Sequence, residues 1–215
     1  MSGFDLIIFD CDGVLVNSER LAVRTDTQIL ADLGWQLSES EVASRFAGRT
    51  SADMQREVEA QIGRSVDWVE LFETRYREIF EKELELIPGI LEVLNGIEAL
   101  TCVASNSKHA DIQYKLTKTG LISKFEDRIF SADDVKSGKP APDIFLHAAQ
   151  TMDVNPQNCA VVEDSFFGVT AAIAAQMTVF GFSGSITTSD ILTTAGALVF
   201  DEMSQLPALL REHRP

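Results

Sequence analysis

Short apolar runs and amphipathic segments alternate along most of this 215-residue chain. The first run, Leu6–Phe9, is too short for a typical helix and has the composition of a strand buried on both faces. From residue 88 onward, similar runs alternate with segments of helical periodicity, which predicts a parallel sheet with helices on both faces. The further predicted strands are Leu100–Ser105, Arg128–Ser131, Cys159–Val162, Thr178–Gly181 and Ala197–Phe200, with helices near 89–98, 108–119, 142–152, 166–176 and 203–211.

The segment that follows the first strand has a different pattern. Strand-like runs disappear there, and apolar residues recur at helical spacing, with a first helix predicted to end at Gly34. An aromatic stripe later in the segment is expected to form helix-bundle core rather than a ligand cage: Trp68, Phe72, Tyr76 and Phe80. We therefore predict a core domain at 1–15 and 86–215, and an inserted helical domain of about four elements at 16–85.

The composition of the chain argues against several functional classes. The chain has 18 Lys and Arg against 33 Asp and Glu, a formal charge of −15, which argues against nucleic-acid binding. No apolar run approaches the roughly 20 residues of a transmembrane helix, and the N-terminus lacks the pattern of a secretory signal. The three cysteines lack metal-ligand spacing and are expected to be small buried hydrophobes in a reducing compartment, the cytoplasm: Cys11, Cys102 and Cys159.

Polar side chains gather where the predicted strands end. In open parallel sheets, ligands bind beyond the carboxyl ends of the strands. The strand ends and the loop before residue 142 supply Asp10, Asp12, Ser105, Asn106, Lys139, Glu163 and Asp164. Four carboxylates at one edge repel one another, so a divalent cation such as Mg²⁺ is the simplest compensation. The lysine and the serine suit a phosphate group bound at the same edge.

Purely structural interpretations of these residues stay open. Asp10–Gly13 can be a strand followed by an ordinary turn. Ser105-Asn106 and Glu163-Asp164-Ser165 are also typical of helix N-caps and first turns. Lys139 can be an exposed loop lysine, which is the usual fate of this residue type.

Four segments, in order, resemble the motifs of the haloacid dehalogenase superfamily. They are FDCDGVLVNSE from residue 4, VASNS from residue 103, GKPAPDIF from residue 138 and VVEDSFFG from residue 161. The resemblance is to the branch of phosphatases and β-phosphoglucomutase-like enzymes, in which a helical cap domain follows the first strand. It implies an α/β fold with a Rossmann-like, doubly wound parallel sheet and an inserted α-helical bundle cap.

The resemblance also implies roles for the site residues. Asp10 is similar to the family nucleophile, which forms an aspartyl-phosphate, and Asp12 to the general acid/base. Lys139 would neutralise charge on the phosphoryl group and on the nucleophile. The phosphoryl oxygens would be held by Ser105 and Asn106. The implied Mg²⁺ ligands are Asp10, Asp12 through its carbonyl, Glu163 and Asp164, the last two directly or through water.

Three positions depart from the mutase-like pattern. Ala22 stands where those members carry a histidine that relays to the acid/base. Arg49 directly follows Gly48, one of several residues in a loop that resembles the substrate-specificity loop, and it is our candidate for substrate binding. Asn17 replaces a frequent acid, which we expect to alter cap hinging or hydrogen bonding rather than chemistry.

These observations favour a Mg²⁺-dependent phosphatase of a small phosphorylated metabolite, with sugar phosphates as the favoured class. A β-phosphoglucomutase-like phosphomutase is the alternative, weakened by Ala22. A third hypothesis is a degenerate family member that only binds a ligand, although the site residues show no sign of decay. We expect a monomer or weak homodimer with no membrane and no nucleic-acid partner.

Overall fold

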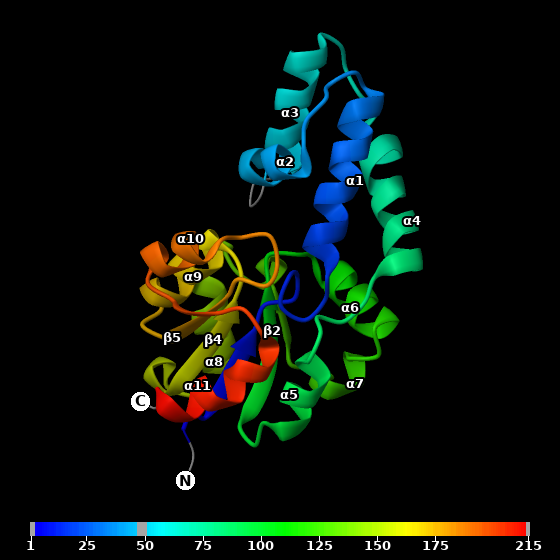
Figure 1. Ribbon diagram of the computed structural model, residues 1–215. Helices are drawn as coiled ribbons and strands as arrows, with labels where there is room; N and C mark the ends of the chain where they lie inside the picture. Colours follow the sequence, from blue (N-terminus) through cyan, green and yellow to red (C-terminus); the bar gives the residue numbers. More distant parts are fainter. Residues whose placement is uncertain (1–2, 47–50, 214–215) are drawn as a thin grey trace. The chain divides into compact units, whose positions relative to one another are not determined.

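The computed structural model describes residues 3–46 and 51–213 (Figure 1). The chain divides into two compact units, one formed by Met1–Asn17 with Glu85–Pro215 and the other by Ser18–Leu84. The first is an α/β unit and the second is helical. The predicted α/β class with an inserted helical bundle is confirmed.

The α/β unit is built on a six-stranded parallel sheet within the described residues, in the order β3-β2-β1-β4-β5-β6. The first strand lies at the centre, where Ile8 pairs with Cys102 on one side and Val161 on the other. The strands are β1 (Leu6–Phe9), β2 (Leu100–Ser105), β3 (Ile129–Ser131), β4 (Cys159–Glu163), β5 (Thr178–Phe182) and β6 (Leu198–Phe200). The order doubles back at β1, so the sheet is doubly wound as predicted.

Both faces of the sheet are covered. Leu6 and Ile8 belong to a buried cluster that includes residues of three helices on one face, among them Phe145, Val169 and Leu192. Ile7 points the other way because side chains alternate along a strand. The helices of this unit are α5 (Ile90–Gly96), α6 (His109–Lys118), α7 (Ile122–Phe125), α8 (Asp143–Thr151), α9 (Phe166–Ala174), α10 (Ser189–Ala195) and α11 (Leu206–Glu212).

Beyond shifts of one or two residues at element ends, the described α/β unit differs from the prediction in three α-helices. The last predicted helix, 203–211, is a 3-10 turn at Met203–Gln205 followed by α11, whose first turn contains Pro207. The helices α7 and α10 were not predicted, because four and seven residues are too few for a clear periodic signal. These differences lie away from the strand ends that carry the candidate residues.

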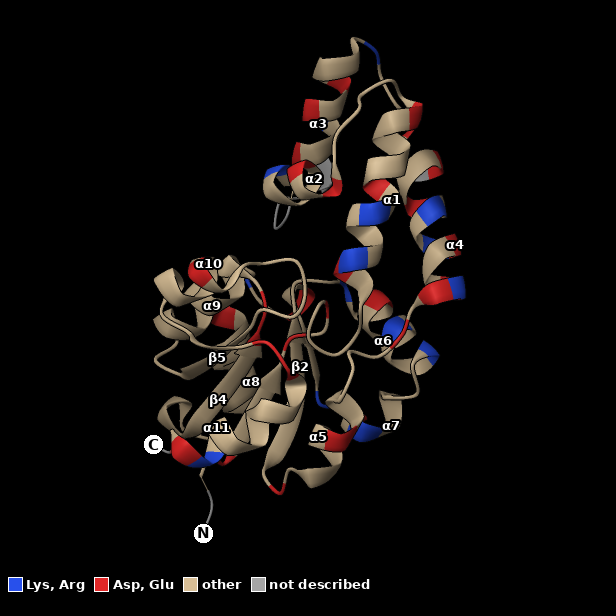
Figure 2. Ribbon diagram, in the orientation of Figure 1, with Lys and Arg blue, Asp and Glu red and all other residues tan. Residues whose placement is uncertain are grey.

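The helical unit contains α1 (Ser18–Asp32), α2 (Glu39–Phe46), α3 (Ser51–Ile62), a π-helical segment (Val69–Glu73) and α4 (Thr74–Glu83). The first half of the aromatic stripe forms core as predicted, since Trp68 and Phe72 are buried and stack with ring centroids 3.8 Å apart. Tyr76 and Phe80 on α4 are only half-buried. Many positions along α1 and α4 are charged (Figure 2). Two ion pairs join these helices, Arg24–Glu83 at 2.6 Å and Arg75–Asp32 at 2.8 Å.

The chain segments that lead out of and back into the α/β unit are hydrogen-bonded to each other. The Asn17 main-chain N–H donates to the Glu85 carbonyl at 3.0 Å, and the Asn17 side-chain oxygen accepts from the Glu85 N–H at 2.9 Å. Asn17 therefore fastens the two segments where they run together. Across the described ranges, no helix has the length and apolar character needed to span a membrane.

Candidate active site

Four predicted site residues come together because three neighbouring strands end at the same edge of the sheet. Asp10 directly follows the central strand β1, and its main-chain N–H donates to the carbonyl of Val162 in β4 at 3.0 Å. Glu163 ends β4 and Ser105 ends β2. Asp10 and Glu163 are both buried, as is Asp164. The edge therefore concentrates acids in a place from which water is largely excluded.

Lys139 is the cation at the centre of this cluster. Its side chain is 3% exposed, and its ammonium lies 2.5 Å from Asp10 Oδ1 and 2.6 Å from Glu163 Oε1. The ammonium also donates to the Ala104 carbonyl at 2.8 Å. The interpretation of Lys139 as an exposed loop lysine is therefore wrong.

Asn106 holds the main chain of Lys139. Its side-chain oxygen accepts from the Lys139 N–H at 2.8 Å, and its side-chain nitrogen donates to the Lys139 carbonyl at 3.1 Å. Both ends of the amide are thus engaged by one residue. The helix that follows is capped at Lys108 rather than at Ser105 or Asn106, so the N-cap interpretation of that pair is wrong.

Glu163 holds the side chain of Lys139 and the start of α9. Its Oε2 accepts from both the N–H and the hydroxyl of Ser165 at 2.9 Å. Ser165 in turn caps α9 by accepting from the Gly168 N–H at 3.0 Å, as the structural interpretation predicted. A Cβ at Gly168 would lie 1.7 Å from Glu163 Oε1, so this close approach requires glycine. Both carboxylate oxygens of Glu163 therefore have protein donors.

Asp12 has a different set of partners. Its Oδ1 forms an ion pair with Lys115 of α6, and its Oδ2 accepts from Ser107 at 2.8 Å. The Ser105 hydroxyl lies 3.4 Å from the same Oδ2. Sequence reasoning missed Lys115 and Ser107. A signal existed for the lysine, which sits between Ile112 and Leu116 on the buried face of its helix.

Burial dominates the electrostatics of the cluster. Burial raises the pKa of Asp10 to about 8, against the lowering effect of Lys139, while Glu163 and Asp12 raise it further. Burial disfavours the charge of Lys139, but its carboxylate neighbours, Asp10 first, raise its pKa above the usual lysine value. Lys139 thus offsets only part of the cost of burying the Asp10 carboxylate, and a bound cation would offset more of it.

The donor set suits a hard divalent cation. Asp164 packs against the turn after β1, where a Cβ at Gly13 would lie 1.9 Å from Asp164 Oδ2. Within the described part of the chain, no group of three or more His, Cys, Asp or Glu side chains could hold a metal ion unaided. Mg²⁺ usually takes one or two carboxylates and completes its shell with water and substrate phosphate. Asp10, Asp164 and a carbonyl of the turn fit that pattern, whereas the oxygens of Glu163 are already used.

Arg49 and the three cysteines complete the set of residues that the sequence singled out. Arg49 lies outside the described residues. All three cysteines are buried and free, and burial raises the pKa of the Cys11 thiol, which argues against a thiolate nucleophile.

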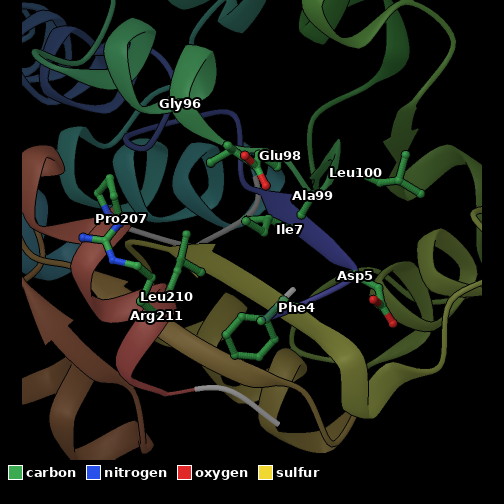
Figure 3. A pocket seen from close by; sticks show the side chains of 12 residues that line it. Phe4, Asp5, Ile7, Gly96, Glu98, Ala99, Leu100, Pro207, Leu210 and Arg211 are labelled. Carbon is green, nitrogen blue, oxygen red and sulfur yellow. The ribbon is translucent and has the colours of Figure 1, made fainter. Parts of the chain in front are cut away.

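A cleft of about 640 Å³ opens at the opposite end of the sheet, near the beginning of β1 (Figure 3). It is lined by Phe4, Ile7, Glu98, Leu210 and Arg211, among others. It therefore lies at the amino ends of the strands, apart from the cluster of acids and lysines at their carboxyl ends.

Comparison with known proteins identifies the family. A model described as haloacid dehalogenase-like hydrolase matches residues 7–182, which is most of the chain. The protein belongs to the haloacid dehalogenase-like hydrolase family.

Two curated relatives span nearly all of the chain. The 6-phosphogluconate phosphatase of Escherichia coli (strain K12) is 33% identical over 212 residues, covering 97% of this chain and 96% of that protein. The phosphorylated carbohydrates phosphatase of Thermotoga maritima is 26% identical over 220 residues, covering 97% of this chain and 99% of that protein.

Two solved structures are similar over their full lengths. A conserved haloacid dehalogenase-like protein of unknown function from Agrobacterium tumefaciens has a TM-score of 0.90 and 39% identity, covering 98% of this chain and 99% of that one. A hydrolase of the same family from Deinococcus radiodurans, determined with bound phosphate and sodium, has a TM-score of 0.85 and 30% identity, covering 99% of this chain and 97% of that one.

Proposed function

We propose that this protein is a Mg²⁺-dependent phosphatase that hydrolyses a small phosphorylated metabolite through an aspartyl-phosphate at Asp10. The observation that carries the proposal is the buried ion pair of Lys139 with Asp10 at the carboxyl edge of the sheet. A buried lysine beside a buried acid is suited to a reaction in which negative charge develops at that point. Membership of a hydrolase family whose relatives include phosphatases supports the same reaction class.

In the first step, a carboxylate oxygen of Asp10 attacks phosphorus. A bond forms between that oxygen and phosphorus while the ester P–O bond on the opposite side breaks. Lys139 neutralises the charge of the nucleophile and of the phosphoryl group, and Glu163 keeps its ammonium in place at 2.6 Å. The leaving alkoxide takes a proton from Asp12.

In the second step, water replaces Asp10 on phosphorus. Asp12 accepts a proton from the attacking water, a bond forms between the water oxygen and phosphorus, and the bond from Asp10 to phosphorus breaks. Inorganic phosphate leaves and the Asp10 carboxylate is restored. One residue thus gives a proton in the first step and takes one in the second, so the protein ends each cycle unchanged.

The residues around Asp10 would divide between phosphate binding and metal binding. Ser105 would donate its hydroxyl to a phosphoryl oxygen, while Asn106, whose amide is used by Lys139, would contribute its main-chain N–H. Asp10, Asp164 and the carbonyl of Asp12 would hold Mg²⁺, with Glu163 acting through Lys139 instead. Bound Mg²⁺ would supply positive charge that orients the phosphate and shields it from the nucleophile.

The substrate class is the finer part of the proposal. Two relatives named as phosphatases of 6-phosphogluconate and of phosphorylated carbohydrates favour sugar phosphates and sugar-acid phosphates. Arg49 is the candidate for gripping a remote anionic group of such a substrate. Arg49→Ala should raise KM about tenfold or more with little change in kcat, because a residue that only grips substrate affects binding. An unchanged KM for every substrate would remove Arg49 from the site.

The direct test is phosphate release from a panel that includes 6-phosphogluconate, hexose 1- and 6-phosphates and nucleotides. We expect turnover with Mg²⁺, none with EDTA, and recovery when excess Mg²⁺ is added. Conversion of β-glucose 1-phosphate to its isomer without phosphate release would instead identify a phosphomutase. Complete lack of reaction with every ester would indicate a ligand-binding protein and overturn the proposal.

A further inference from the structure

A second buried lysine lies near the site and has no role in the mechanism above. Lys115 is 7% exposed, although lysine is among the residues least often buried. It belongs to α6, whose other buried residues are the apolar Ile112 and Leu116. Burying an ammonium is costly unless it is paired, and the ion pair with Asp12 compensates this cost.

The partners of Lys115 are the acid/base Asp12 and the serine that also binds it. Its ammonium pairs with Asp12 Oδ1 and lies 3.4 Å from the Ser107 hydroxyl, which donates to Asp12 Oδ2 at 2.8 Å. The two carboxylate oxygens thus meet two different donors. Such an arrangement fixes both the position of the carboxylate and its rotation about the Cβ–Cγ bond.

Ser107 is itself held by the end of the sheet. Its N–H donates to the Ser105 hydroxyl at 3.1 Å, and its carbonyl accepts from the Ser131 hydroxyl at 2.7 Å. Ser105 and Ser131 end β2 and β3. The donors to Asp12 are therefore anchored on rigid elements rather than on a loose loop, which is what accurate placement of a reacting group requires.

Three acids of the site are divided between two lysines. Lys139 binds Asp10 and Glu163, whereas Lys115 binds Asp12. The Ser105 hydroxyl, which we assign to the phosphoryl group, lies 3.4 Å from Asp12 Oδ2. Lys115 therefore holds Oδ1, whereas Oδ2 is bound by Ser107 and faces the hydroxyl that we assign to the phosphoryl group.

We propose that Lys115 is a positioning residue that, together with Ser107, fixes the Asp12 carboxylate for proton transfer to the leaving group. The inference rests on the proposed phosphatase function. It assigns Lys115 no contact with substrate, since its effect passes through Asp12. Loss of Lys115 should therefore matter most when the leaving group needs a proton.

The test compares two esters by kcat/KM, which reports the steps up to release of the leaving group. One is p-nitrophenyl phosphate, whose leaving group departs as an anion, and the other is the sugar phosphate of highest turnover in the panel. Lys115→Met should lower kcat/KM for the sugar phosphate about 10- to 100-fold, within the usual range for a general acid, and for p-nitrophenyl phosphate less than about threefold. Lys115→Arg should restore part of the loss.

Three further variants serve as controls for the comparison of the two esters. Lys118→Met, an exposed lysine on the same helix, should leave both values unchanged. Ser107→Ala should also lower kcat/KM for the sugar phosphate selectively, but by a smaller factor. This variant tests the same inference if Lys115→Met does not fold. In an Asp12→Asn background, Lys115→Met should add no further selective loss, because both changes remove one function.

The outcomes separate the inference from the function on which it rests. Equal losses for both esters, or no loss, in a protein whose wild type is active would overturn the role of Lys115 and leave the phosphatase intact. Additive losses in the Asp12→Asn background would also overturn it. No turnover by the wild type would overturn the proposed function and this inference with it.

Discussion

The α/β unit and the helical unit handle charge in opposite ways. In the α/β unit, the Lys139 side chain is 3% exposed and lies between two buried carboxylates. In the helical unit, the pair Arg75–Asp32 has side chains that are 39% and 63% exposed. Breaking a buried pair leaves an unpaired charge out of water, whereas breaking an exposed pair returns both groups to solvent. The buried pairs around Lys139 should therefore be costly to break, whereas the exposed pair Arg75–Asp32 should be cheap to break.

One group of the helical unit departs from this contrast. Asp26 of α1 is 6% exposed and accepts a hydrogen bond from Tyr76 of α4. Burial raises the pKa of Asp26 to about 7, although the Tyr76 bond lowers it. In the described part of the helical unit, arginines form ion pairs with acids other than Asp26. Asp26 is therefore a buried acid whose pKa lies near neutral pH.

We expect the largest loss of stability and of activity from Lys139→Met. This change leaves Asp10 and Glu163 buried without their ammonium, which should destabilise the protein by about 3–5 kcal/mol. Activity should fall at least about 1,000-fold because the charge that stabilises the transition state is lost. Urea unfolding and phosphate release measure the two effects.

A matched control lies in the same loop. Lys136 is exposed, so Lys136→Met should change stability by no more than about 0.5 kcal/mol and leave activity intact. If the two variants proved equally stable and equally active, the contrast between buried and exposed charge would be wrong.

We expect a smaller change in the free energy of unfolding from the titration of Asp26. Its folded pKa is raised, so the folded state holds a proton that the unfolded state releases above pH 4, and stability falls as pH rises toward 7. Between pH 5 and pH 8 this residue should lower the free energy of unfolding by about 2–3 kcal/mol.

Asp26→Asn isolates that contribution. The variant should gain stability over the wild type as pH rises from 5 to 8, and match it more closely at pH 5. Chemical denaturation at both pH values gives the difference. A constant offset between variant and wild type would mean that Asp26 keeps an ordinary pKa in the folded protein.

The smallest effect is expected from Arg75→Ala. The pair it breaks is exposed on both sides, so the free energy of unfolding should change by less than about 1 kcal/mol and phosphatase activity should not change. Thermal unfolding at low and high salt measures the effect. A loss comparable to that of Lys139→Met would erase the distinction between the two units.

Features set by residues that are neighbours in the sequence could be predicted, whereas specific contacts between residues far apart in the chain could not. The strands β1 and β2 match their predicted bounds because each is a short apolar run. The convergence of Asp10, Glu163 and Lys139 followed from one rule, that parallel strands end at a common edge. Composition and local pattern were enough for these features.

The burial of Lys115 could be inferred from its place on the apolar face of α6, but its partner could not. Its partner Asp12 is 103 residues away in the chain. The different positions of the two neighbouring acids could not be predicted either. Only the side-chain contacts show that Glu163 binds Lys139 and that Asp164 lies against Gly13. The strand ends predicted which residues meet, but not which atoms pair.

The central claim is that Asp10 becomes phosphorylated during turnover. The most direct measurement is acid quenching of the enzyme during reaction with a radiolabelled phosphate ester, followed by identification of the labelled peptide. We predict label on the peptide that contains Asp10, removable by hydroxylamine as expected of an acyl phosphate, and absent from a folded Asp10→Asn variant. Turnover without label on that peptide, or full activity of Asp10→Asn, would contradict the account.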